Sequence, residues 1–371
     1  MDGALLTESI NTDNALIYTV FRNKDVAFYL RAGKLLSVFS KGEGLPVGTV
    51  CIGKISEIKP DINACFLLLK DKQKCFMQIP EAEAAANLSR EGNGIKCGDN
   101  LLIEISKEPA KGKLASARAF PDKSSKKTVS GVSLSDKSSF SGDSNNFAEF
   151  LAVLQDARTR TDFSIIREGE DYIDKSLQFA LSITKAYGDD GPVRVLTDQA
   201  ELVNSLGAHI DRFTPDGDST FLAPKFYEDA LVSLKVLYGL ESKVQEAQNR
   251  KVWLKSGSYI TIENTEAMTV IDVNSAKSSA KKSEEDHYFT VNAEAADEIV
   301  RQIILRNLSG IIIVDFINMK NKDLQNDIID RIRNHPLNYE KTMNICGFTR
   351  LGLLELTRRK TGHPLTEVFT L

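Results

Sequence analysis

Two aspartates, Asp272 and Asp315, each stand near the end of a short apolar run and could do metal chemistry together. Carboxylates that converge repel one another unless a cation lies between them. Oxygen ligands in small number suit Mg²⁺, which keeps several waters and is usually bound through one or two carboxylates together with a substrate phosphate. The pair therefore predicts a magnesium-assisted site for phosphodiester chemistry. The alternative is that Asp272 caps a loop and that Asp315 pairs with a basic side chain such as Arg350.

The segments around these aspartates predict a β-α-β unit that brings the two carboxylates together. Residues 268–274 and 311–318 are apolar and rich in β-branched residues, and they are too short for helices, so they predict buried strands. Residues 292–308 place apolar side chains largely on one helical face, with Asn292 as the expected N-cap and Gly310 as the stop signal. Such a crossover makes the two strands parallel, and ligands bind at the carboxyl ends of parallel strands.

Four stretches of this region resemble, in order, the consecutive motifs of the ribonuclease E/G family. They are Thr-Val-Ile-Asp-Val-Asn-Ser at 269–275, Asn-Ala-Glu-Ala-Ala-Asp-Glu-Ile at 292–299, Leu-Arg-Asn-Leu-Ser-Gly-Ile-Ile-Ile-Val-Asp-Phe-Ile at 305–317 and Thr-Arg-Leu-Gly-Leu-Leu-Glu-Leu-Thr-Arg at 349–358. The resemblance implies that Asp272 and Asp315 hold the metal. It also implies that Asn274 orients the site and that Arg350 binds phosphate. The family commonly has a second aspartate where this chain has Asn318.

The composition is that of a soluble globular protein, with 42% hydrophobic and 26% charged residues among 371. The net charge of −4 does not indicate nucleic acid binding, so any RNA-binding surface must be a local basic patch. Five cysteines show no C-x-x-C spacing, and we find no signal peptide or membrane-spanning apolar run. We therefore expect a cytoplasmic protein with free thiols and without a structural zinc site.

Residues 46–118 show closely spaced strand and turn signals that fit a small OB-type barrel. Such barrels bind single strands by stacking bases on aromatic rings flanked by cations. This stretch resembles the S1 RNA-binding domain that is inserted near the N-terminus of ribonuclease E/G enzymes. The resemblance assigns RNA contacts to Phe66 and Phe76, and Lys111 is among the flanking cations. The alternative is that both phenylalanines belong to the barrel core.

The resemblance implies a multi-domain α/β chain in which the barrel interrupts a ribonuclease H-like subdomain. We expect 1–45 and 188–247 to form the two parts of that subdomain, 46–118 the S1-type OB-fold, 119–146 a flexible linker, 147–187 a degenerate 5′-sensor region and 248–371 a DNase I-like catalytic subdomain. The linker is expected because its Ser, Lys, Gly and Asp residues cannot bury enough apolar surface to offset the entropy of ordering.

The 5′-sensor region departs from the family pattern. The family recognises the 5′-monophosphate of RNA through an Ile-Arg-Thr motif, and this chain keeps Arg167 but has Glu168 in place of the threonine. A carboxylate beside a phosphate is repulsive, so we expect a weakened pocket. The alternative for Arg167 is an ion pair with Glu168 or Glu170.

Two further features have open alternatives. Trp253, in an expected hairpin at 251–260, is assigned to the core, and RNA stacking is the alternative. The basic residues of the last segment are expected to form a phosphate-contacting strip near Asp315, with a solvated basic face as the alternative for all but the first; they are Arg350, Arg358, Arg359 and Lys360. The family's Cys-Pro-x-Cys zinc link is absent from this sequence, so we expect no zinc-linked assembly, although an oligomer of another kind stays open.

These observations predict a magnesium-dependent endoribonuclease that cleaves single-stranded RNA in RNA processing or decay. A rival hypothesis is a catalytically impaired RNA-binding homologue of ribonuclease E/G, which Asn318 and Glu168 favour.

Overall fold

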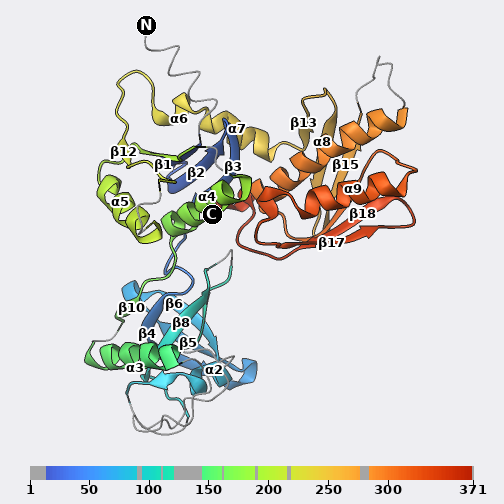
Figure 1. Cartoon of the computed structure of the whole chain (residues 1–371). Coiled ribbons are helices and arrows are strands. Elements are labelled where there is room, and N and C mark those ends of the chain that lie inside the picture. The colour runs from blue at the N-terminus through green and yellow to red at the C-terminus, as the bar shows by residue number, and fades with distance from the viewer. Residues whose placement is uncertain are drawn as a thin grey trace. The chain divides into compact units, whose positions relative to one another are not determined.

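The computed structural model of the chain describes residues 14–89, 94–109, 112–120, 144–160, 163–188, 191–214, 219–275 and 284–369. Lys111 and most of the expected linker at 119–146 lie outside these residues. The chain divides into two compact units (Figure 1). The barrel unit is Lys41–Asp171, and the two-sheet unit combines Met1–Ser40 with Tyr172–Leu371.

The barrel unit contains a closed five-stranded barrel with the strand order β4-β5-β6-β9-β8 and closure between β8 and β4. Its strands are β4 (Val50–Lys59), β5 (Ala64–Leu68), β6 (Lys74–Gln78), β8 (Asn100–Lys107) and β9 (Ala115–Ala119). β6 and β9 pair in parallel and the other neighbours pair antiparallel. This arrangement confirms the expected OB-like barrel.

Short elements surround the barrel strands. They are β7 (Ala86–Asn87), β10 (Ile165–Arg167), the helices α2 (Ile79–Ala84) and α3 (Ser144–Thr159), and the 3-10 turns η1 (Pro60–Ile62) and η2 (Lys70–Lys72). β7 pairs with β8, and β10 pairs antiparallel with β4. The barrel unit therefore includes the strand that carries Arg167.

Alternation along the barrel strands fills the interior with small and medium side chains, among them three cysteines. Burial raises the pKa of the Cys51 and Cys75 thiols to about 12 and that of Cys65 to about 11, so all three are neutral thiols. Cys97 and Cys346 are exposed, and all five cysteines are free, as expected.

The first sheet of the two-sheet unit has the order β12-β11-β1-β2-β3. Its strands are β1 (Ala15–Phe21), β2 (Lys24–Arg31), β3 (Lys34–Ser40), β11 (Arg194–Thr197) and β12 (Lys225–Phe226). The first three form antiparallel hairpins, and β11 pairs parallel to β1. The accompanying helices are α4 (Tyr172–Tyr187), α5 (Leu202–Phe213), α6 (Leu234–Leu237) and α7 (Leu240–Gln248). The Tyr18 hydroxyl and the Ser176 hydroxyl, 2.7 Å apart, join β1 to α4.

The second sheet has the order β13-β14-β15-β16-β18-β17. Its strands are β13 (Lys251–Trp253), β14 (Tyr259–Asn264), β15 (Met268–Asn274), β16 (Gly310–Asp315), β17 (Met343–Phe348) and β18 (Leu353–Arg358). The helices that follow β15 and β16 are α8 (Glu284–Leu305) and α9 (Lys322–Arg333), and η4 (Pro336–Asn338) and α10 (Leu365–Val368) come later. β15 and β16 run parallel, and the other neighbouring pairs are antiparallel.

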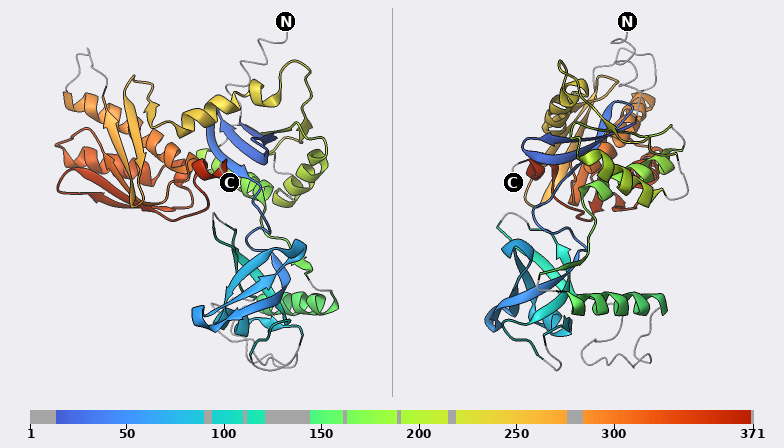
Figure 2. Two further views of the ribbon diagram at one scale, coloured as in Figure 1. Left: turned by 180° about the vertical axis from the view of Figure 1, so that it is seen from behind. Right: turned by 90° about the vertical axis from the view of Figure 1, so that its left-hand side faces the viewer.

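The two faces of the second sheet differ in environment. Helices α8 and α9 lie along one face (Figures 1 and 2), where Ile271 and Ile312 share a core with Ile299 of α8 and Ile328 of α9. On the opposite face, which we call the open face, apolar side chains of β15 and β16 such as Met268 are exposed. Among the described residues, every helix is too short or too polar to cross a lipid bilayer.

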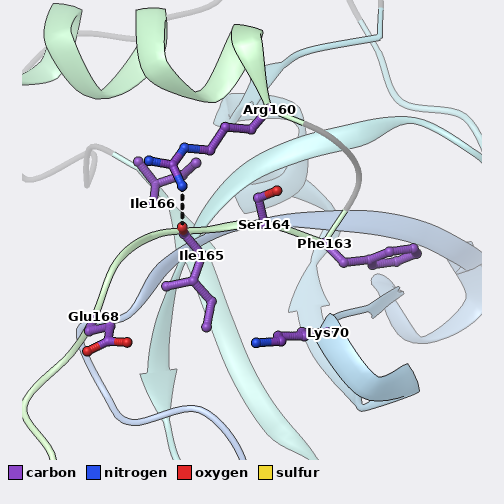
Figure 3. A pocket seen from close by; sticks show the side chains of 7 residues that line it. All are labelled: Lys70, Arg160, Phe163, Ser164, Ile165, Ile166 and Glu168. Carbon is purple, nitrogen blue, oxygen red and sulfur yellow. Dashed lines mark hydrogen bonds between the residues drawn. The ribbon is translucent and has the colours of Figure 1, made fainter.

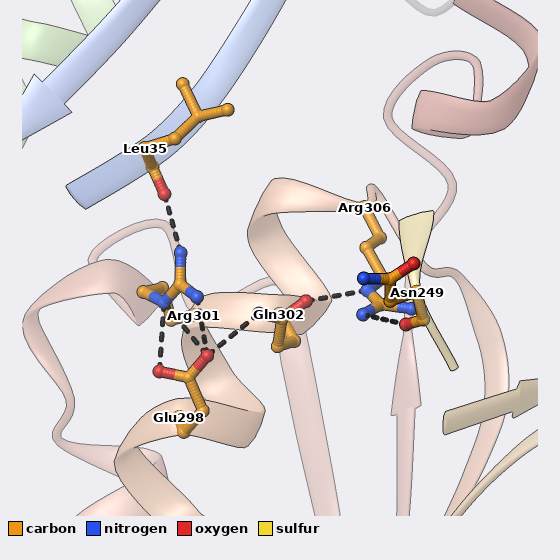
Figure 4. A network of polar contacts seen from close by, with 6 residues as sticks. All are labelled: Leu35, Asn249, Glu298, Arg301, Gln302 and Arg306. Carbon is orange, nitrogen blue, oxygen red and sulfur yellow. Dashed lines mark hydrogen bonds and ion pairs between the residues drawn. The ribbon is translucent and has the colours of Figure 1, made fainter. Parts of the chain in front are cut away.

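A polar network on α8 ties the second sheet's helix to the first sheet (Figure 4). Its members are Leu35, Asn249, Glu298, Arg301, Gln302 and Arg306. Arg301 donates to the Leu35 carbonyl at 2.7 Å and to Glu298 at 2.6 Å, and Gln302 donates to the same carboxylate at 2.8 Å. Burial acts to raise the pKa of Glu298, but the hydrogen bond and charge of Arg301 and the hydrogen bond from Gln302 outweigh it and hold that pKa below its usual value. Burial and the charge of Arg301 lower the pKa of Arg306 to about 10.

Candidate active site

Asp272 and Asp315 are register partners on the adjacent parallel strands β15 and β16. Neighbouring strands lie about 4.8 Å apart, so the two carboxylates begin from backbone positions at that spacing. The predicted β-α-β unit and its shared sheet edge are therefore confirmed. Asp272 is half-buried and Asp315 is exposed.

The strand period decides which way these side chains point. Ile271 and Val273 are buried against the helices, so the alternate residues Asp272 and Asn274 lie on the open face. Asn274 Nδ2 donates a hydrogen bond of 2.6 Å to Asp272 Oδ2. This bond occupies one lone pair of the carboxylate and fixes its orientation. Within the described part of the chain no ion pair joins Asp315 to Arg350.

Asn292 has a different position from the one expected. Helix α8 begins at Glu284, so Asn292 lies inside the helix and is fully buried instead of capping it. Its side-chain amide donates to the Ile317 carbonyl at 2.8 Å and accepts from the Ile317 amide at 3.0 Å. These two bonds hold the backbone two residues beyond Asp315. Asn292 is thus a positioning residue, whereas the sequence analysis assigned it as the N-cap of the helix.

Arg350 lies at the turn between β17 and β18 and is exposed. The Thr349 amide bonds the Leu353 carbonyl at 2.8 Å, and Gly352 takes a positive φ of 85° that only glycine adopts readily. Leu353 is the register partner of Asp315. The turn therefore brings Arg350 to the same edge of the sheet as both aspartates.

The expected basic strip near Asp315 is wrong beyond Arg350. Arg358 lies on β18, which runs antiparallel to β16, and it pairs in register with Gly310. Gly310 and Asp315 are at opposite ends of β16, about 17 Å apart along the strand. It is only 8% exposed and donates to Asn307 Oδ1 and to the Leu308 carbonyl, both at 2.8 Å. Arg359 and Lys360 follow it along the chain, so they also lie away from the aspartates. Arg358 therefore stabilises the loop that precedes β16 through these hydrogen bonds.

Phe66 and Phe76 lie outside the barrel core. They are register partners on β5 and β6, while the alternate residues of those strands face the interior. Their rings are half-buried and meet edge to face with centroids 6.2 Å apart. Lys59 Nζ stands 5.6 Å from the Phe66 ring centroid. This is an aromatic pair with a cation on the outer surface of an OB-like barrel, and the core alternative is wrong.

Arg167 and Glu168 have separate surroundings in the barrel unit. The Arg167 guanidinium stands over the Phe120 ring at 5.3 Å from its centroid. Glu168 instead lines a cavity of about 590 Å³ together with Lys70, Arg160 and the segment 163–166 (Figure 3). Arg160 is held there by Asp156 and by the Ile165 carbonyl at 3.4 Å. The cavity thus contains a carboxylate and two cations, and Arg167 is not among its lining residues.

Trp253 was assigned to the core, and this assignment is wrong. Trp253 is 64% exposed on the edge strand β13. Among the described strands β13 pairs with β14 alone. Trp253 falls on the open face because Leu254 next to it is buried.

The donor set of the aspartate pair fits a magnesium ion. Two carboxylates stand at one register position, one is oriented by an amide donor, and both are accessible from the open face. Mg²⁺ takes few protein oxygens and fills its remaining positions with water and substrate phosphate, which an accessible pair permits. Asp272 and Asp315 would hold the ion.

The fold and site together define an α/β protein with an OB-like barrel and an acidic edge on two parallel strands. The chain belongs to the ribonuclease E/G family, whose family model matches residues 144–361, more than half of the chain. It is similar to ribonuclease G of Salmonella typhimurium, with 41% identity over 36% of this chain and 27% of that protein. It is also similar to ribonuclease G of Haemophilus influenzae, with 34% identity over 50% of this chain and 40% of that protein.

A ribonuclease E of Nostoc is 31% identical over 60% of this chain and 31% of that protein. The chain therefore matches well under half of the length of each of these curated relatives.

Proposed function

We propose that this chain is a magnesium-dependent endoribonuclease that cleaves single-stranded RNA. The observation that carries the proposal is the register pairing of Asp272 with Asp315 at the end of two parallel strands. Bound there, Mg²⁺ would act as a Lewis acid on a phosphoryl oxygen and lower the pKa of an attacking water. The family and the names of the relatives support RNA as the substrate.

The chain's own residues supply orientation and charge. Asn274 holds one oxygen of Asp272, so the second oxygen keeps a fixed direction. Asn292 holds the backbone after Asp315. Arg350, exposed at the same edge, binds a phosphate of the RNA through its planar guanidinium. Phe66 and Phe76 bind bases on the barrel, and Arg167 contributes a further cation to RNA binding.

The domain assignment belongs to the same proposal. Residues 1–45 and 188–247 form the ribonuclease H-like subdomain, 46–118 the S1-type barrel, 119–146 the linker, 147–187 the degenerate 5′-sensor region and 248–371 the DNase I-like catalytic subdomain. Support comes from the two separate sheets of the two-sheet unit, one on each side of residue 248. We further propose that the protein acts in the cytoplasm on RNA processing or decay.

The second candidate function is RNA binding without efficient cleavage. Two observations favour it, namely Asn318 in place of a family aspartate and Glu168 in the lining of the cavity beside β10.

A cleavage assay separates the two functions. The purified chain is incubated with an end-labelled, AU-rich single-stranded RNA, with Mg²⁺ or with EDTA, and the same RNA annealed to its complement is the control. We expect internal cuts of the single strand that require Mg²⁺ and are strongly reduced in the duplex. RNA binding without any cutting in Mg²⁺ would favour the impaired homologue instead.

The aromatic pair on the barrel gives a separate prediction. Phe66→Ala combined with Phe76→Ala should weaken single-stranded RNA binding, by about 1–3 kcal/mol for each base that loses its stacking partner. Thermal unfolding should change little because both rings lie outside the barrel core. Fluorescence anisotropy of a labelled RNA measures the affinity, and Val47→Ala, at another partly exposed apolar site of the barrel unit, is the control. A large loss of stability with unchanged affinity would contradict the assignment.

A further inference from the structure

An exposed aromatic cluster occupies the outer end of the open face. Trp253, the single tryptophan of the sequence, meets Tyr259 edge to face with ring centroids 5.3 Å apart and planes at 62°. Lys251 Nζ stands 3.9 Å from the Trp253 ring centroid and 3.6 Å from that of Tyr259. The ammonium group is therefore held against both rings by cation–π attraction, which keeps a positive charge beside this aromatic cluster.

The strand register ties this cluster to the aspartate pair. Trp253 is the partner of Tyr259, and Tyr259 is the partner of Asn274. Two strand spacings separate Trp253 from Asn274, or about 10 Å between their backbones. In the adjacent row Lys251 pairs with Thr261, which pairs with Asp272. The aromatic cluster and the carboxylates thus share one face and neighbouring rows.

We propose that Trp253, Tyr259 and Lys251 form a base-stacking platform that binds an unpaired base of the RNA close to the bond that is cut. The proposal rests on the proposed function, because it takes the aspartate pair as the site of cleavage. It assigns to this part of the second sheet a role in substrate binding that is additional to that of the barrel.

Four arguments favour a nucleobase as the occupant. An exposed indole offers a flat apolar surface on which any base can stack, so such a contact tolerates different sequences. Lys251 adds a cation for the neighbouring phosphate. β14 carries one acidic side chain, Glu263, which is ion-paired with Arg250, so its charge is compensated. An aromatic pair with an adjacent lysine also occurs on the barrel at Phe66, Phe76 and Lys59.

The single tryptophan makes the proposal directly measurable, since all tryptophan emission comes from Trp253. The Asp315→Asn variant of the full chain, which should not cut, is titrated with a single-stranded oligoadenylate and with an abasic oligoribonucleotide of equal length. Tryptophan emission and the anisotropy of a labelled RNA are followed in parallel. We expect the oligoadenylate to quench the emission with the same midpoint as its binding, and the abasic strand to cause much less quenching.

Substitutions test whether the indole contributes affinity. Trp253→Ala should weaken oligoadenylate binding about fivefold or more, and Trp253→Phe should restore most of the loss because a ring remains. Leu231→Ala is the matched control, since Leu231 is a 94% exposed apolar residue of the same unit and lies outside both sheets. Thermal unfolding of each variant distinguishes a lost contact from a lost fold.

The outcomes separate the platform from the proposed function. Binding without quenching, together with normal affinity of Trp253→Ala, would overturn the platform while wild-type cleavage left the endoribonuclease intact. Quenching by oligoadenylate in a protein whose wild type cuts no RNA would support the platform and overturn the nuclease. Quenching that depends on protein concentration without RNA would identify a second copy as the occupant and overturn the proposal.

Discussion

Asp272→Asn and Asp315→Asn should each reduce the cleavage of single-stranded RNA at least about a thousandfold, which corresponds to about 4 kcal/mol of transition-state stabilisation. Each change keeps the shape of the side chain and replaces one of the two carboxylates that would hold the ion with a neutral amide. The fold should be unaffected because both side chains lie on the open face, where neither is fully buried. Initial rates of cleavage at saturating RNA, over a range of Mg²⁺ concentrations, measure the effect.

The matched control is Glu355→Gln. Glu355 is an exposed carboxylate of the same sheet, on the strand next to β16 and opposite Ile313. The Glu355→Gln variant should cut single-stranded RNA at nearly the wild-type rate. RNA affinity of both aspartate variants should stay within about threefold of wild type, or about 0.7 kcal/mol, because the proposed stacking residues are untouched. A wild-type cleavage rate in either aspartate variant would show that the assigned site is wrong.

The aspartate pair could be predicted from the sequence because few physical alternatives were open to it. Apolar runs of strand length on either side of a helical period dictate a parallel crossover, and the crossover brings both strand ends to one edge. For these two strands the local apolar pattern was sufficient to predict the secondary structure.

The remaining site residues depend on contacts that local signals do not contain. Asn292 resembles an N-cap by residue type, yet the helix continues for eight residues before it, and its partner Ile317 lies in another segment. Arg358 was assigned to the wrong edge because the direction of β18 in the sheet was unknown. Trp253 was assigned to the core because the sequence does not indicate which face of β13 is covered. Strand β9 contains three alanines, which have low strand propensity, and its pairing with β6 and β8 overrides that preference.

Glu298→Gln should lower the free energy of unfolding by about 3–5 kcal/mol at pH 7, the cost of breaking a buried ion pair on one side. The Glu298 carboxylate accepts from Arg301 and Gln302, and both Glu298 and Arg301 are largely buried. Glutamine removes the charge that compensates Arg301, while Arg301 still joins α8 to the Leu35 carbonyl of the first sheet. The substitution therefore leaves an uncompensated guanidinium at the junction of α8 with the first sheet. Urea unfolding followed by circular dichroism measures the loss.

The same substitution has a defined pH dependence. The pKa of Glu298 is lowered in the folded protein, so the unfolded chain binds a proton at higher pH than the folded chain does. The stabilising effect is therefore complete above the ordinary carboxyl pKa of 4.5 and is lost as pH falls through the lowered value. The difference between wild type and Glu298→Gln should shrink when unfolding is measured below pH 4.5.

Asp330→Asn is the control for that measurement, because Asp330 pairs with Arg333 in a pair that is more than half exposed on both sides. Such surface pairs contribute about 0–1 kcal/mol, so this variant should unfold at nearly the wild-type urea concentration. An equal loss for Glu298→Gln at neutral and acidic pH would mean that packing and not charge sets its effect. Wild-type stability of Glu298→Gln would mean that the network does not hold α8 against the first sheet.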